Sequence, residues 1–313
     1  MCSVHYTLRS CDCCFRRITL MTTKPLVGKV ALVAGATRGC GRGIAVSLGE
    51  AGATVYCTGR TTRNQRSPIN RTETIDDTAE MVTAAGGQGI AIQVDHNDPA
   101  QVEALIQRIN TEQSGQLDIV VNDIWGGQHA LVWEQKFWQG DIHTNLNLVH
   151  NSIDTHLITS FYAAPLMVAR GQGLIIEVTD GDTLNYRGHS IYDLIKTSVM
   201  RIAVGMHEDL KDHGVTALAV TPGFLRSEEM LDYFGVSEEN WRDAIAKDPH
   251  YSESETPYYL GRAIVALASD SNIAQKAGKT WASWTLMEEY GFFDVDGRQP
   301  NWGAYYAKVL EQG

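Results

Sequence analysis

The sequence lacks both long apolar runs and an excess of positive charge, and these two absences exclude several classes of protein. No stretch of about 18 or more apolar residues occurs in the 313-residue chain, so we expect no helix that spans a membrane. Lysine and arginine total 26 against 37 acidic residues, which gives a formal net charge of −11. Because an acidic surface repels phosphate groups, we expect neither nucleic acid nor a membrane surface as a partner.

The main body of the chain is also poor in cysteine. Four of the six cysteines lie before residue 15, and only Cys40 and Cys57 follow them. A disulfide framework would distribute paired cysteines through a small secreted domain, so this pattern favours a reducing, cytoplasmic compartment. The early cluster of Cys11, Cys13 and Cys14 is not followed by a second cysteine or histidine pair at zinc spacing, so we expect no metal site.

The first 22 residues differ in character from the rest of the chain. They contain arginines but little acid, and they show no helical period. We interpret residues 1–22 as an extension without fixed structure, or as a start upstream of Met21, in preference to an organelle targeting segment. Residues 23–313 contain no linker rich in proline, glycine or serine, so we expect one domain there, with an insertion at about 227–255 on the substrate side.

From Val30 onward, short apolar runs alternate with longer segments of helical character. The sequence predicts strands at about residues 30–33, 54–57, 89–94, 119–121, 174–178, 216–220 and 280–284. It predicts a first helix that ends near Glu50 and further helices at about 73–85, 100–113, 151–169, 191–212 and 256–268. This alternation predicts an α/β fold: a single Rossmann-like, doubly wound parallel sheet with helices on both faces.

A glycine-rich turn joins the first predicted strand to the helix that follows it. Gly35, Gly39 and Gly41 are spaced as Gly-x-x-x-Gly-x-Gly, and Thr37 and Arg38 lie between them. Glycines let a backbone turn tightly and approach a pyrophosphate, whose negative charge is favoured at the amino terminus of a helix. A glycine cluster alone is weak evidence, but the strand before it and the helix after it favour a nucleotide site over a structural turn.

The end of the second predicted strand indicates which cofactor the site takes. An enzyme that uses NAD usually has an acid there, which accepts a hydrogen bond from the ribose 2′-hydroxyl. This chain instead has Gly59 and then Arg60, whose guanidinium suits a 2′-phosphate, and Arg38 adds a second positive charge nearby. We therefore predict NADP, against the alternative that both arginines are only solvated. Asp95 is placed to accept from the adenine amine, and Asn122 is placed to brace either the sheet or the cofactor.

A tyrosine and a lysine four residues apart follow the fifth predicted strand. On a helix, Tyr192 and Lys196 share a face, so the ammonium is expected near the phenol. A nearby positive charge favours phenolate, and we expect it to lower the pKa of Tyr192 toward neutrality. Such a tyrosine donates a proton to a carbonyl oxygen as hydride arrives, or accepts one in the reverse reaction. The pair is common on protein surfaces, and only its position in this chain makes it specific.

Taken together, these motifs resemble those of the short-chain dehydrogenase/reductase (SDR) family. The matching residues are Gly35, Gly39, Gly41, Asp95, Asn122, Tyr192, Lys196 and the pair Pro222-Gly223 after the sixth strand. The resemblance begins near Val27, covers most of the chain, and in finer detail follows the dehydrogenase/reductase member 1 branch. It implies that Pro222, Gly223 and Ser227 belong to the cofactor site, with Ser227 on the nicotinamide side. It also implies a homodimer or homotetramer, often packed through the helices after the fourth and fifth strands.

Two positions depart from the pattern that the resemblance implies. The family serine falls on Thr179 when counted back from Tyr192, or on Asp180 when the end of the strand is aligned. Thr179 would keep a hydroxyl that orients a carbonyl, whereas an ionised Asp180 only accepts hydrogen bonds and would repel an oxyanion. Asp180 could instead hold a substrate hydroxyl or amine. The family asparagine falls on Ser152, with Asn151 beside it, and we assign that role to neither residue.

Aromatic residues are frequent in the loops after the fourth, fifth and sixth strands, where ligands bind in such folds. These residues are Trp125, Trp133, Phe137, Trp138, Tyr186, Phe224, Tyr233, Phe234 and Trp241, and we expect some of them to line a partly apolar pocket. The leading hypothesis is an NADP(H)-dependent oxidoreductase that acts on a small carbonyl or alcohol substrate. The alternatives are an NADP-binding module that has lost catalysis, and a related lyase or epimerase in which Asp180 is the working acid or base.

Overall fold

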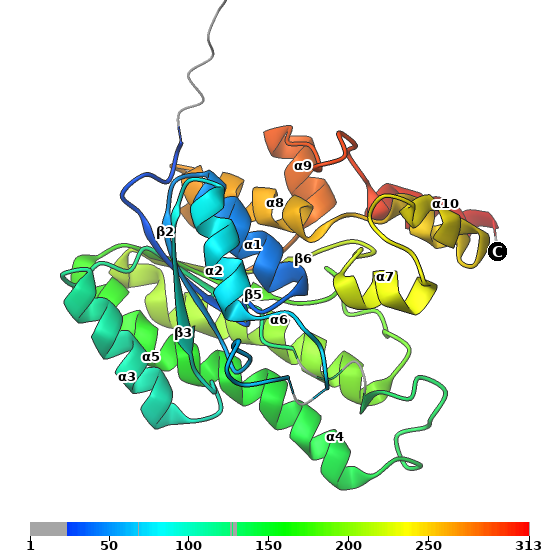
Figure 1. Ribbon diagram of the computed structural model, residues 1–313, viewed down its shortest axis with the longest axis horizontal. Coiled ribbons are helices and arrows are strands. Elements are labelled where there is room, and N and C mark those ends of the chain that lie inside the picture. The colour runs from blue at the N-terminus through cyan, green and yellow to red at the C-terminus, as the bar shows by residue number, and fades with distance from the viewer. Residues whose placement is uncertain (1–23, 68, 126, 128–129, 313) are drawn as a thin grey trace, which may run out of the picture.

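A parallel seven-stranded sheet runs through the centre of the computed structural model, which describes residues 24–67, 69–125, 127 and 130–312 (Figure 1). The strands are β1 (Val30–Ala34), β2 (Thr54–Gly59), β3 (Gln88–Gln93), β4 (Ile119–Asn122), β5 (Gly173–Val178), β6 (Val215–Thr221) and β7 (Thr280–Ala282). Their order across the sheet is β3-β2-β1-β4-β5-β6-β7. The strand order changes direction beside β1, and ligands bind at such a point outside the carboxyl ends of the strands.

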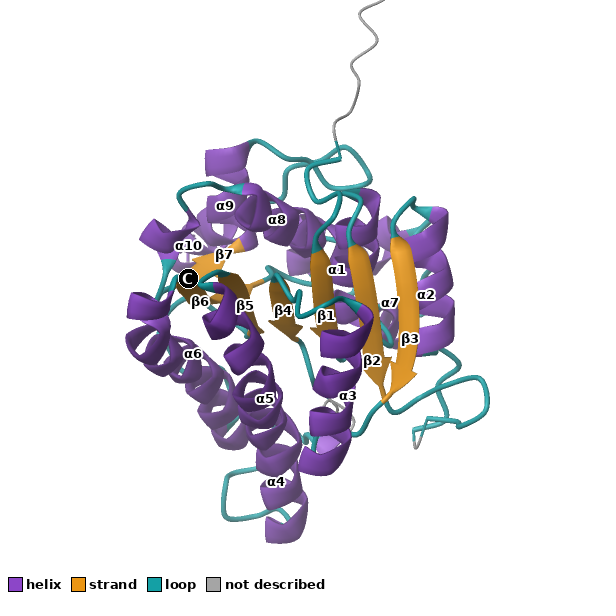
Figure 2. Cartoon of the chain, turned by 90° about the vertical axis from the view of Figure 1, so that its left-hand side faces the viewer, coloured by secondary structure: helices purple, strands orange, loops and turns teal. Residues whose placement is uncertain are grey.

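Helices cover both faces of this sheet, which confirms the predicted doubly wound α/β fold (Figure 2). One face carries α1 (Gly39–Glu50), α2 (Ile75–Ala84) and α8 (Pro257–Ser269), with α9 (Ser283–Tyr290) packed on α8. The other carries α3 (Pro99–Glu112), α5 (Thr155–Arg170) and α6 (Ser190–Leu210). The remaining helices are α4 (Ile142–Val149), α7 (Glu228–Phe234) and α10 (Trp302–Gln312).

The apolar core lies in two layers because the central strands are buried on both faces. In β1 every residue is buried, and alternate side chains enter opposite layers: Ala31 and Val33 face α1 and α8, whereas Val30 and Leu32 face α3 and α5. The α3 helix begins as its sequence indicates, since the Asp98 carboxylate accepts from the amides of the first turn and Pro99 follows it. Both layers hold the strand ends, and therefore the loops beyond them, in fixed positions.

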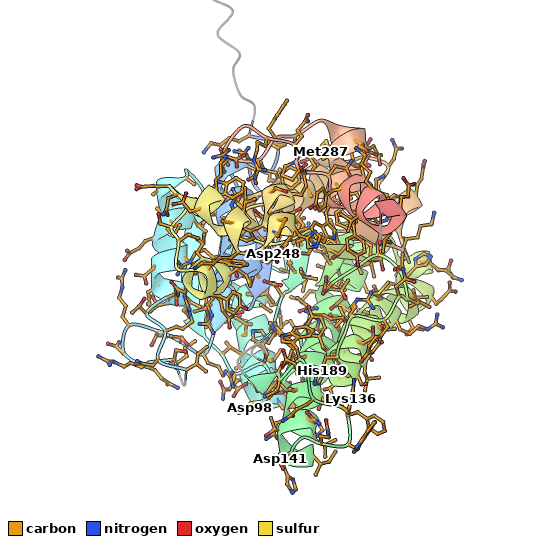
Figure 3. All side chains as sticks on the ribbon, turned by 90° about the vertical axis from the view of Figure 1, so that its right-hand side faces the viewer. Asp98, Lys136, Asp141, His189, Asp248 and Met287 are labelled. Carbon is orange, nitrogen blue, oxygen red and sulfur yellow. The ribbon has the colours of Figure 1, made fainter. Side chains whose placement is uncertain are left out.

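Two predicted element boundaries were wrong. The last strand ends at Ala282, because Ser283 already begins α9. The helix expected from residue 151 begins nine residues earlier, because the Asp141 carboxylate caps α4 by accepting from the Thr144 amide at 2.8 Å. A π turn at His150–Asp154 then joins α4 to α5. The start of α4 projects from the body of the molecule, where Lys136 and Asp141 mark it in Figure 3.

The segment expected as an insertion, 227–255, holds α7 and two short 3-10 turns. Phe234, Trp241 and Tyr251 form a small apolar cluster of their own within it. The segment follows β6 directly, so α7 lies beside the carboxyl end of the sheet. The extension expected at residues 1–22 lies outside the described residues.

Candidate active site

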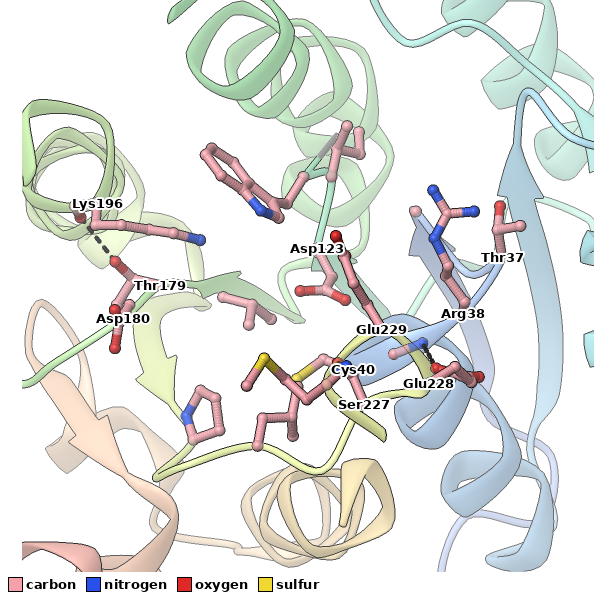
Figure 4. Close-up of a pocket in the computed structure, with 18 of the residues that line it drawn as sticks. Thr37, Arg38, Cys40, Asp123, Thr179, Asp180, Lys196, Ser227, Glu228 and Glu229 are labelled. Atoms are coloured by element: carbon pink, nitrogen blue, oxygen red, sulfur yellow. Dashed lines mark hydrogen bonds between the residues drawn. The ribbon is translucent and has the colours of Figure 1, made fainter. Parts of the chain in front are cut away.

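A cavity of about 970 Å³ opens at the carboxyl ends of the central strands, and Figure 4 shows part of it. Most of the sequence-predicted site residues line it: Gly35, Thr37, Arg38, Gly39, Arg60, Asp95, Thr179, Asp180, Tyr192, Lys196, Pro222, Gly223 and Ser227. The structure therefore brings together residues that are almost two hundred positions apart in the sequence. Gly41 and Asn122 do not belong to this lining, and their contacts explain why.

The glycine turn after β1 depends on the absence of side chains at two positions. Gly35 has a φ of +90°, and a Cβ on it would lie 2.5 Å from the carbonyl oxygen of Asp123. A Cβ on Gly41 would lie 2.2 Å from the carbonyl oxygen of Gly35, so Gly41 acts by closing the turn against α1. The turn thus places the backbone amides at the start of α1 on the cavity surface, where an anionic group can approach them.

An internal carboxylate already lies at this helix terminus. The Gly39 amide donates to Oε2 of Glu228 at 2.7 Å, and Arg42 lies 3.4 Å from Oε1 of the same side chain. Glu228 is the first residue of α7, and Ser227 caps that helix by accepting from the Met230 amide. Sequence reasoning did not single out Glu228, because nothing local to it indicates a partner 189 residues earlier.

Both predicted phosphate-binding arginines reach the cavity beside the end of β2. Among the described residues, neither the Arg38 nor the Arg60 guanidinium forms a hydrogen bond or an ion pair. Partial burial lowers the pKa of Arg38, against the opposing charge of Glu73. The neighbouring Arg63 differs, because it is engaged by Asp77 and Glu80 at 2.6 Å each. Two cations are thus available to an anionic ligand at this end of the cavity.

Of the two polar residues predicted at strand ends, Asp95 and Asn122, only Asp95 faces the cavity. Asp95 lines the cavity, and its carboxylate accepts from the Asn97 amide. Asn122 was also expected at the cofactor, but its side chain is buried and donates to Ser160 at 2.9 Å and to Glu177 at 2.7 Å. Because it is the last residue of β4 and points into the α5 layer, Asn122 braces the sheet. Of the two roles that the sequence left open for Asn122, these contacts support the bracing of the sheet and not the contact with a cofactor.

A buried hydrogen-bond network lies behind Asn122 and was not expected from the sequence. Glu177 in β5 is fully buried and accepts from Nδ1 of His156 on α5 at 2.5 Å. Ser160 also donates to Glu177, so the carboxylate is held by three side chains, including Asn122. A buried carboxylate without such partners would be strongly destabilising. This network therefore fixes α5 against the strand ends that carry the site.

The Tyr192 phenol forms its hydrogen bond with an acid. Tyr192 and Lys196 share one face of α6 as predicted, and the Tyr192 hydroxyl donates to Oδ2 of Asp180 at 2.7 Å. Burial, and then the charge of Asp180, raise the pKa of Tyr192 well above its ordinary value. The expected lowering of this pKa by Lys196 was therefore wrong for the protein alone, because burial disfavours the phenolate and the charge of Asp180 acts in the same direction.

The Lys196 ammonium lies among aromatic rings. Its Nζ is 4.7 Å from the centre of the Trp125 ring and 5.5 Å from that of Tyr192. Burial lowers the pKa of Lys196, while Asp180 and then Asp123 act in the opposite direction. In Figure 4 the lysine side chain extends across the cavity toward Asp123. The cation thus lies over two ring faces, and the charges of two carboxylates favour its protonated form.

The structure separates the two candidates for the family serine. Thr179 is buried, and its hydroxyl donates to the carbonyl oxygen of Lys196 at 2.7 Å. Its only proton is used to hold α6 in place, so the geometry does not support the expected role of Thr179 in donating to a carbonyl. Asp180 is the residue beside the phenol, and Arg187 donates from Nε to its backbone oxygen.

The π turn between α4 and α5 holds the position of the family asparagine. Ser152 is buried within it, whereas Asn151 lines the cavity and accepts from the Asn97 side chain at 2.6 Å. Single π turns inside helices often occur at functional sites. The side chain at the cavity is thus Asn151, brought there by a change of helical pitch that the sequence did not indicate.

Asp123 is a further site residue that sequence reasoning missed. It follows Asn122, lines the cavity, and lies beside Cys40 in Figure 4. Burial raises the pKa of Asp123 to about 7, although Lys196 and His156 oppose the shift. The Asp123 carboxyl can therefore gain or lose a proton near neutral pH.

Aromatic residues from three distant segments line the substrate side. Trp125 and Trp133 pack edge-on against the Tyr192 ring, with ring centres 5.5 and 5.1 Å away, and Phe224 lines the cavity after β6. The other loop aromatics listed from the sequence do not line it, and Phe137 and Trp138 are mostly exposed on the projecting loop. Three rings from the carboxyl-terminal part, Trp284, Trp302 and Tyr306, line it instead.

Two classes of site find no support among the described residues. No helix there is both long and apolar enough to cross a membrane. No group of three or more histidine, cysteine, aspartate or glutamate side chains in that part of the chain is arranged to hold a metal ion.

Comparisons with known proteins agree with this geometry. A family model described as "short chain dehydrogenase" matches residues 29–234. Dehydrogenase/reductase SDR family member 1 of Mus musculus is 34% identical over 280 residues, with 88% of this chain and 85% of that protein covered. The Homo sapiens protein of the same name is 33% identical over 278 residues, with the same coverage. A 3-oxoacyl-[acyl-carrier-protein] reductase FabG of Staphylococcus aureus is 31% identical over 203 residues, which cover 64% of this chain and 76% of that protein.

Solved structures give the same fold. A crystal structure of a short chain dehydrogenase from Mycobacterium thermoresistibile superimposes with a TM-score of 0.73 over 89% of this chain and 92% of that chain, at 20% identity. At this identity the likeness concerns the fold alone. The family match and the two relatives carry the assignment: this chain belongs to the short-chain dehydrogenase/reductase family of oxidoreductases.

Proposed function

We propose that the protein is an NADP(H)-dependent oxidoreductase that transfers hydride between the nicotinamide and a carbonyl or secondary alcohol of a small, partly apolar molecule. Membership of the family establishes a dehydrogenase/reductase that uses a nicotinamide cofactor. The observation that carries the finer proposal is one cavity with the Arg38 and Arg60 guanidinium groups, unpaired among the described residues, at one end and the Tyr192–Lys196 pair at the other.

The residues that line the cavity fit such a cofactor. A Cβ at Gly35 or Gly41 would fill the turn, so the glycines keep open the approach to the amides of α1. Arg38 and Arg60 supply the forked donors that suit a 2′-phosphate. Pro222, Gly223 and Ser227 would form the nicotinamide side, and Asp95 the adenine side. When bound, the cofactor would donate or accept the hydride.

The protein's own residues would transfer the proton to or from the substrate oxygen. Tyr192 would be the acid in reduction and the base in oxidation, because its phenol lines the cavity and contacts an ionisable side chain. Lys196 would lower the cost of forming phenolate by its positive charge. Asp180 would hold the phenol in place until a substrate arrives. Thr179 would fix the backbone of α6 and so position Lys196.

We further propose that the protein forms a homodimer or homotetramer. On α5 the side chains of Leu157 and Phe161 are 46% and 72% exposed, and Ile142 and Leu146 on α4 are 59% and 48% exposed. A row of exposed apolar side chains along adjoining helices supports packing against a second copy. The cytoplasmic location stays a prediction.

Titration with NADPH and NADH, followed by cofactor consumption over a panel of ketones and aldehydes, tests the proposed function. We expect tighter binding of NADPH, turnover of at least one panel member, and a loss of turnover by about 1,000-fold or more in Tyr192→Phe. Tyr186→Phe is the matched control, because Tyr186 is exposed and lies outside the cavity lining.

Two other outcomes would each select a different function. Binding of NADPH without consumption of any panel member would favour a binding module, which the departures at Thr179 and Asp180 motivate. Activity that survives Tyr192→Phe and is lost in Asp180→Asn would favour lyase or epimerase chemistry, with Asp180 as the acid or base.

A further inference from the structure

Two hydroxyl groups near the reacting position, those of Tyr192 and Thr179, already donate their protons to acceptors within the protein. Tyr192 donates its phenolic proton to Asp180 at 2.7 Å, and Thr179 donates its proton to the backbone of Lys196 at 2.7 Å. A neutral ketone offers only an acceptor, so it can take the Tyr192 proton only by leaving the Asp180 carboxylate without its partner. An unpaired, partly buried carboxylate is unfavourable. A better substrate would bring a donor for Asp180 with it.

The charges and rings beside the phenol favour a donor that is positive. Asp123 and Asp180 line this part of the cavity against the single cation Lys196. Arg187 donates to the backbone oxygen of Asp180, but its guanidinium is paired with Asp193 at 3.0 Å and donates to the Thr183 carbonyl as well. Among the described residues, no cation forms an ion pair with the Asp180 carboxylate, whose side-chain partner there is the neutral Tyr192 phenol.

Three aromatic rings complete the environment. Trp125 and Trp133 meet the Tyr192 ring edge-on, at 5.5 and 5.1 Å between ring centres. Ring faces attract cations, and the Lys196 ammonium already lies over two of these rings. A carboxylate beside aromatic rings is an arrangement that recognises an ammonium group.

We infer that the substrate carries a protonated amine on the carbon next to the reacting one, so that it is a 1,2-amino alcohol or the corresponding α-amino ketone. This inference rests on the proposed hydride-transfer function. The Asp180 oxygen and the Tyr192 oxygen are 2.7 Å apart, so groups on adjacent carbons can reach both. The substrate ammonium donates to Asp180 and takes the place of the phenol there, and the phenol turns to the substrate oxygen.

In the oxidation, the bonds and charges balance without any further reagent. The carbinol C–H bond breaks and its hydride passes to NADP⁺, which becomes NADPH. The alcohol O–H proton passes to the Tyr192 phenolate, whose own proton has been lost to solvent, and the C–O bond becomes C=O. The ammonium keeps its charge throughout, held by Asp180. Reduction of the α-amino ketone is the same sequence reversed, with Tyr192 donating the proton.

A pair of alcohols of equal size tests this inference on the wild-type protein. The two substrates are 2-amino-1-phenylethanol and 1-phenylpropan-1-ol, which differ by an ammonium in place of a methyl group, and NADPH formation from NADP⁺ is followed for each. We expect kcat/KM for the amino alcohol to exceed that for the plain alcohol by about tenfold or more, because only the amino alcohol forms a charged hydrogen bond with Asp180. Equal or better oxidation of the plain alcohol overturns the inference and leaves the proposed function standing.

Variants at Asp180 and Asp182, in the loop after β5, test whether Asp180 causes the preference for the amino alcohol. Asp180→Asn is expected to remove the preference: the ratio of kcat/KM for the amino alcohol to kcat/KM for the plain alcohol should fall about tenfold or more. Asp182→Asn is the matched control, because Asp182 is exposed on the same loop and lies outside the cavity lining. An equal loss for both alcohols in Asp180→Asn would overturn the inference.

A binding measurement separates failure of the inference from failure of the proposed function. Calorimetric titration of the NADP⁺-bound protein with 2-phenylethylamine needs no turnover, and we expect binding to weaken about tenfold in Asp180→Asn. Equal affinity for wild type and Asp180→Asn overturns the inference even if neither alcohol is oxidised. Absence of turnover with both alcohols and with the whole carbonyl panel counts instead against the proposed function.

Discussion

The backbone amide of Gly39 donates a 2.7 Å hydrogen bond to the carboxylate of Glu228, so an internal anion lies at the helix terminus where the cofactor's pyrophosphate is expected. Like charges at one helix terminus compete for the same amides. We therefore expect Glu228→Gln to bind NADPH about 3- to 10-fold more tightly, because the repulsion is removed while the side chain keeps its size. Fluorescence titration measures the change.

The control for this variant lies on the same helix. Asp232→Asn also removes one negative charge from α7, but Asp232 pairs with Arg71 and does not line the cavity. It should leave the affinity for NADPH nearly unchanged. Unchanged or weaker binding in Glu228→Gln would mean that the carboxylate holds α7 in a position that the cofactor needs.

The proposed preference for NADP is expected to depend on Arg38 and Arg60, whose guanidinium groups line the cavity and have no partner in the part of the chain that the structure describes. Replacement of either by alanine removes a charge-assisted hydrogen bond to the 2′-phosphate, which is worth about 1.5–3 kcal/mol. We expect the Kd of NADPH to rise about 10- to 100-fold and that of NADH to stay within about twofold. Arg63→Ala is the control, because Arg63 is already paired with Asp77 and Glu80. Equal weakening of both cofactors would place the arginines at the pyrophosphate and argue against NADP specificity.

The ends of β4 and β5 mark the limit of what the sequence could predict. The alternation of strands and helices predicted the sheet. The glycine turn and the Tyr192–Lys196 spacing predicted the two ends of the site. Successive residues at a strand end point to opposite sides, however, so a shift of one position exchanges roles. The side chains of Asn122 and Thr179 therefore make structural contacts within the protein, although Thr179 borders the cavity. Their neighbours Asp123 and Asp180 line the cavity with carboxyl groups.

Other site features depend on contacts that span the chain. Trp302 and Tyr306 come from α10, whose sequence carries no sign that it returns to the carboxyl ends of the strands. The Glu228–Gly39 bond joins residues 189 positions apart. The pKa values of site residues depend on burial, which is a tertiary property. The sequence predicted that Lys196 lowers the pKa of Tyr192, but burial, and then the charge of Asp180, raise it.

Assembly of the proposed oligomer should depend on the exposed apolar side chains of α5. Phe161 is 72% exposed and packs edge-on against Tyr162 with ring centres 5.2 Å apart. A glutamate at this position would bury a charge in the interface, so we expect Phe161→Glu to shift the protein toward monomer in sedimentation velocity. Val27→Glu is the control, since Val27 is 70% exposed but lies outside α4 and α5. An unchanged oligomer in Phe161→Glu would exclude this face as the interface.

Glu255 makes the free energy of unfolding depend on pH. This side chain is buried beneath the nicotinamide end of the cavity, where Oε2 accepts from the Gly223 amide at 3.0 Å and from Ser283 at 2.6 Å, and Oε1 has no partner among the described residues. Burial raises the pKa of Glu255 to about 8 from an ordinary 4.5. Between these values the unfolded chain has released a proton that the folded protein still holds. The contribution to stability is therefore complete below about pH 4.5 and is lost as the pH rises through about 8.

Glu255→Gln replaces the protonated carboxyl by a group of the same shape that does not titrate. We expect the variant to gain stability relative to wild type as the pH rises from about 6 to about 9, by an amount on the order of 2–4 kcal/mol. Urea unfolding of both proteins across this range measures the difference, and the titration of every other group cancels in it. A difference that stays constant with pH would show that Glu255 is ionised in the folded protein. The Oε1 oxygen would then need a cationic or hydrogen-bonding partner, because an ionised carboxylate with one bare buried oxygen is not stable.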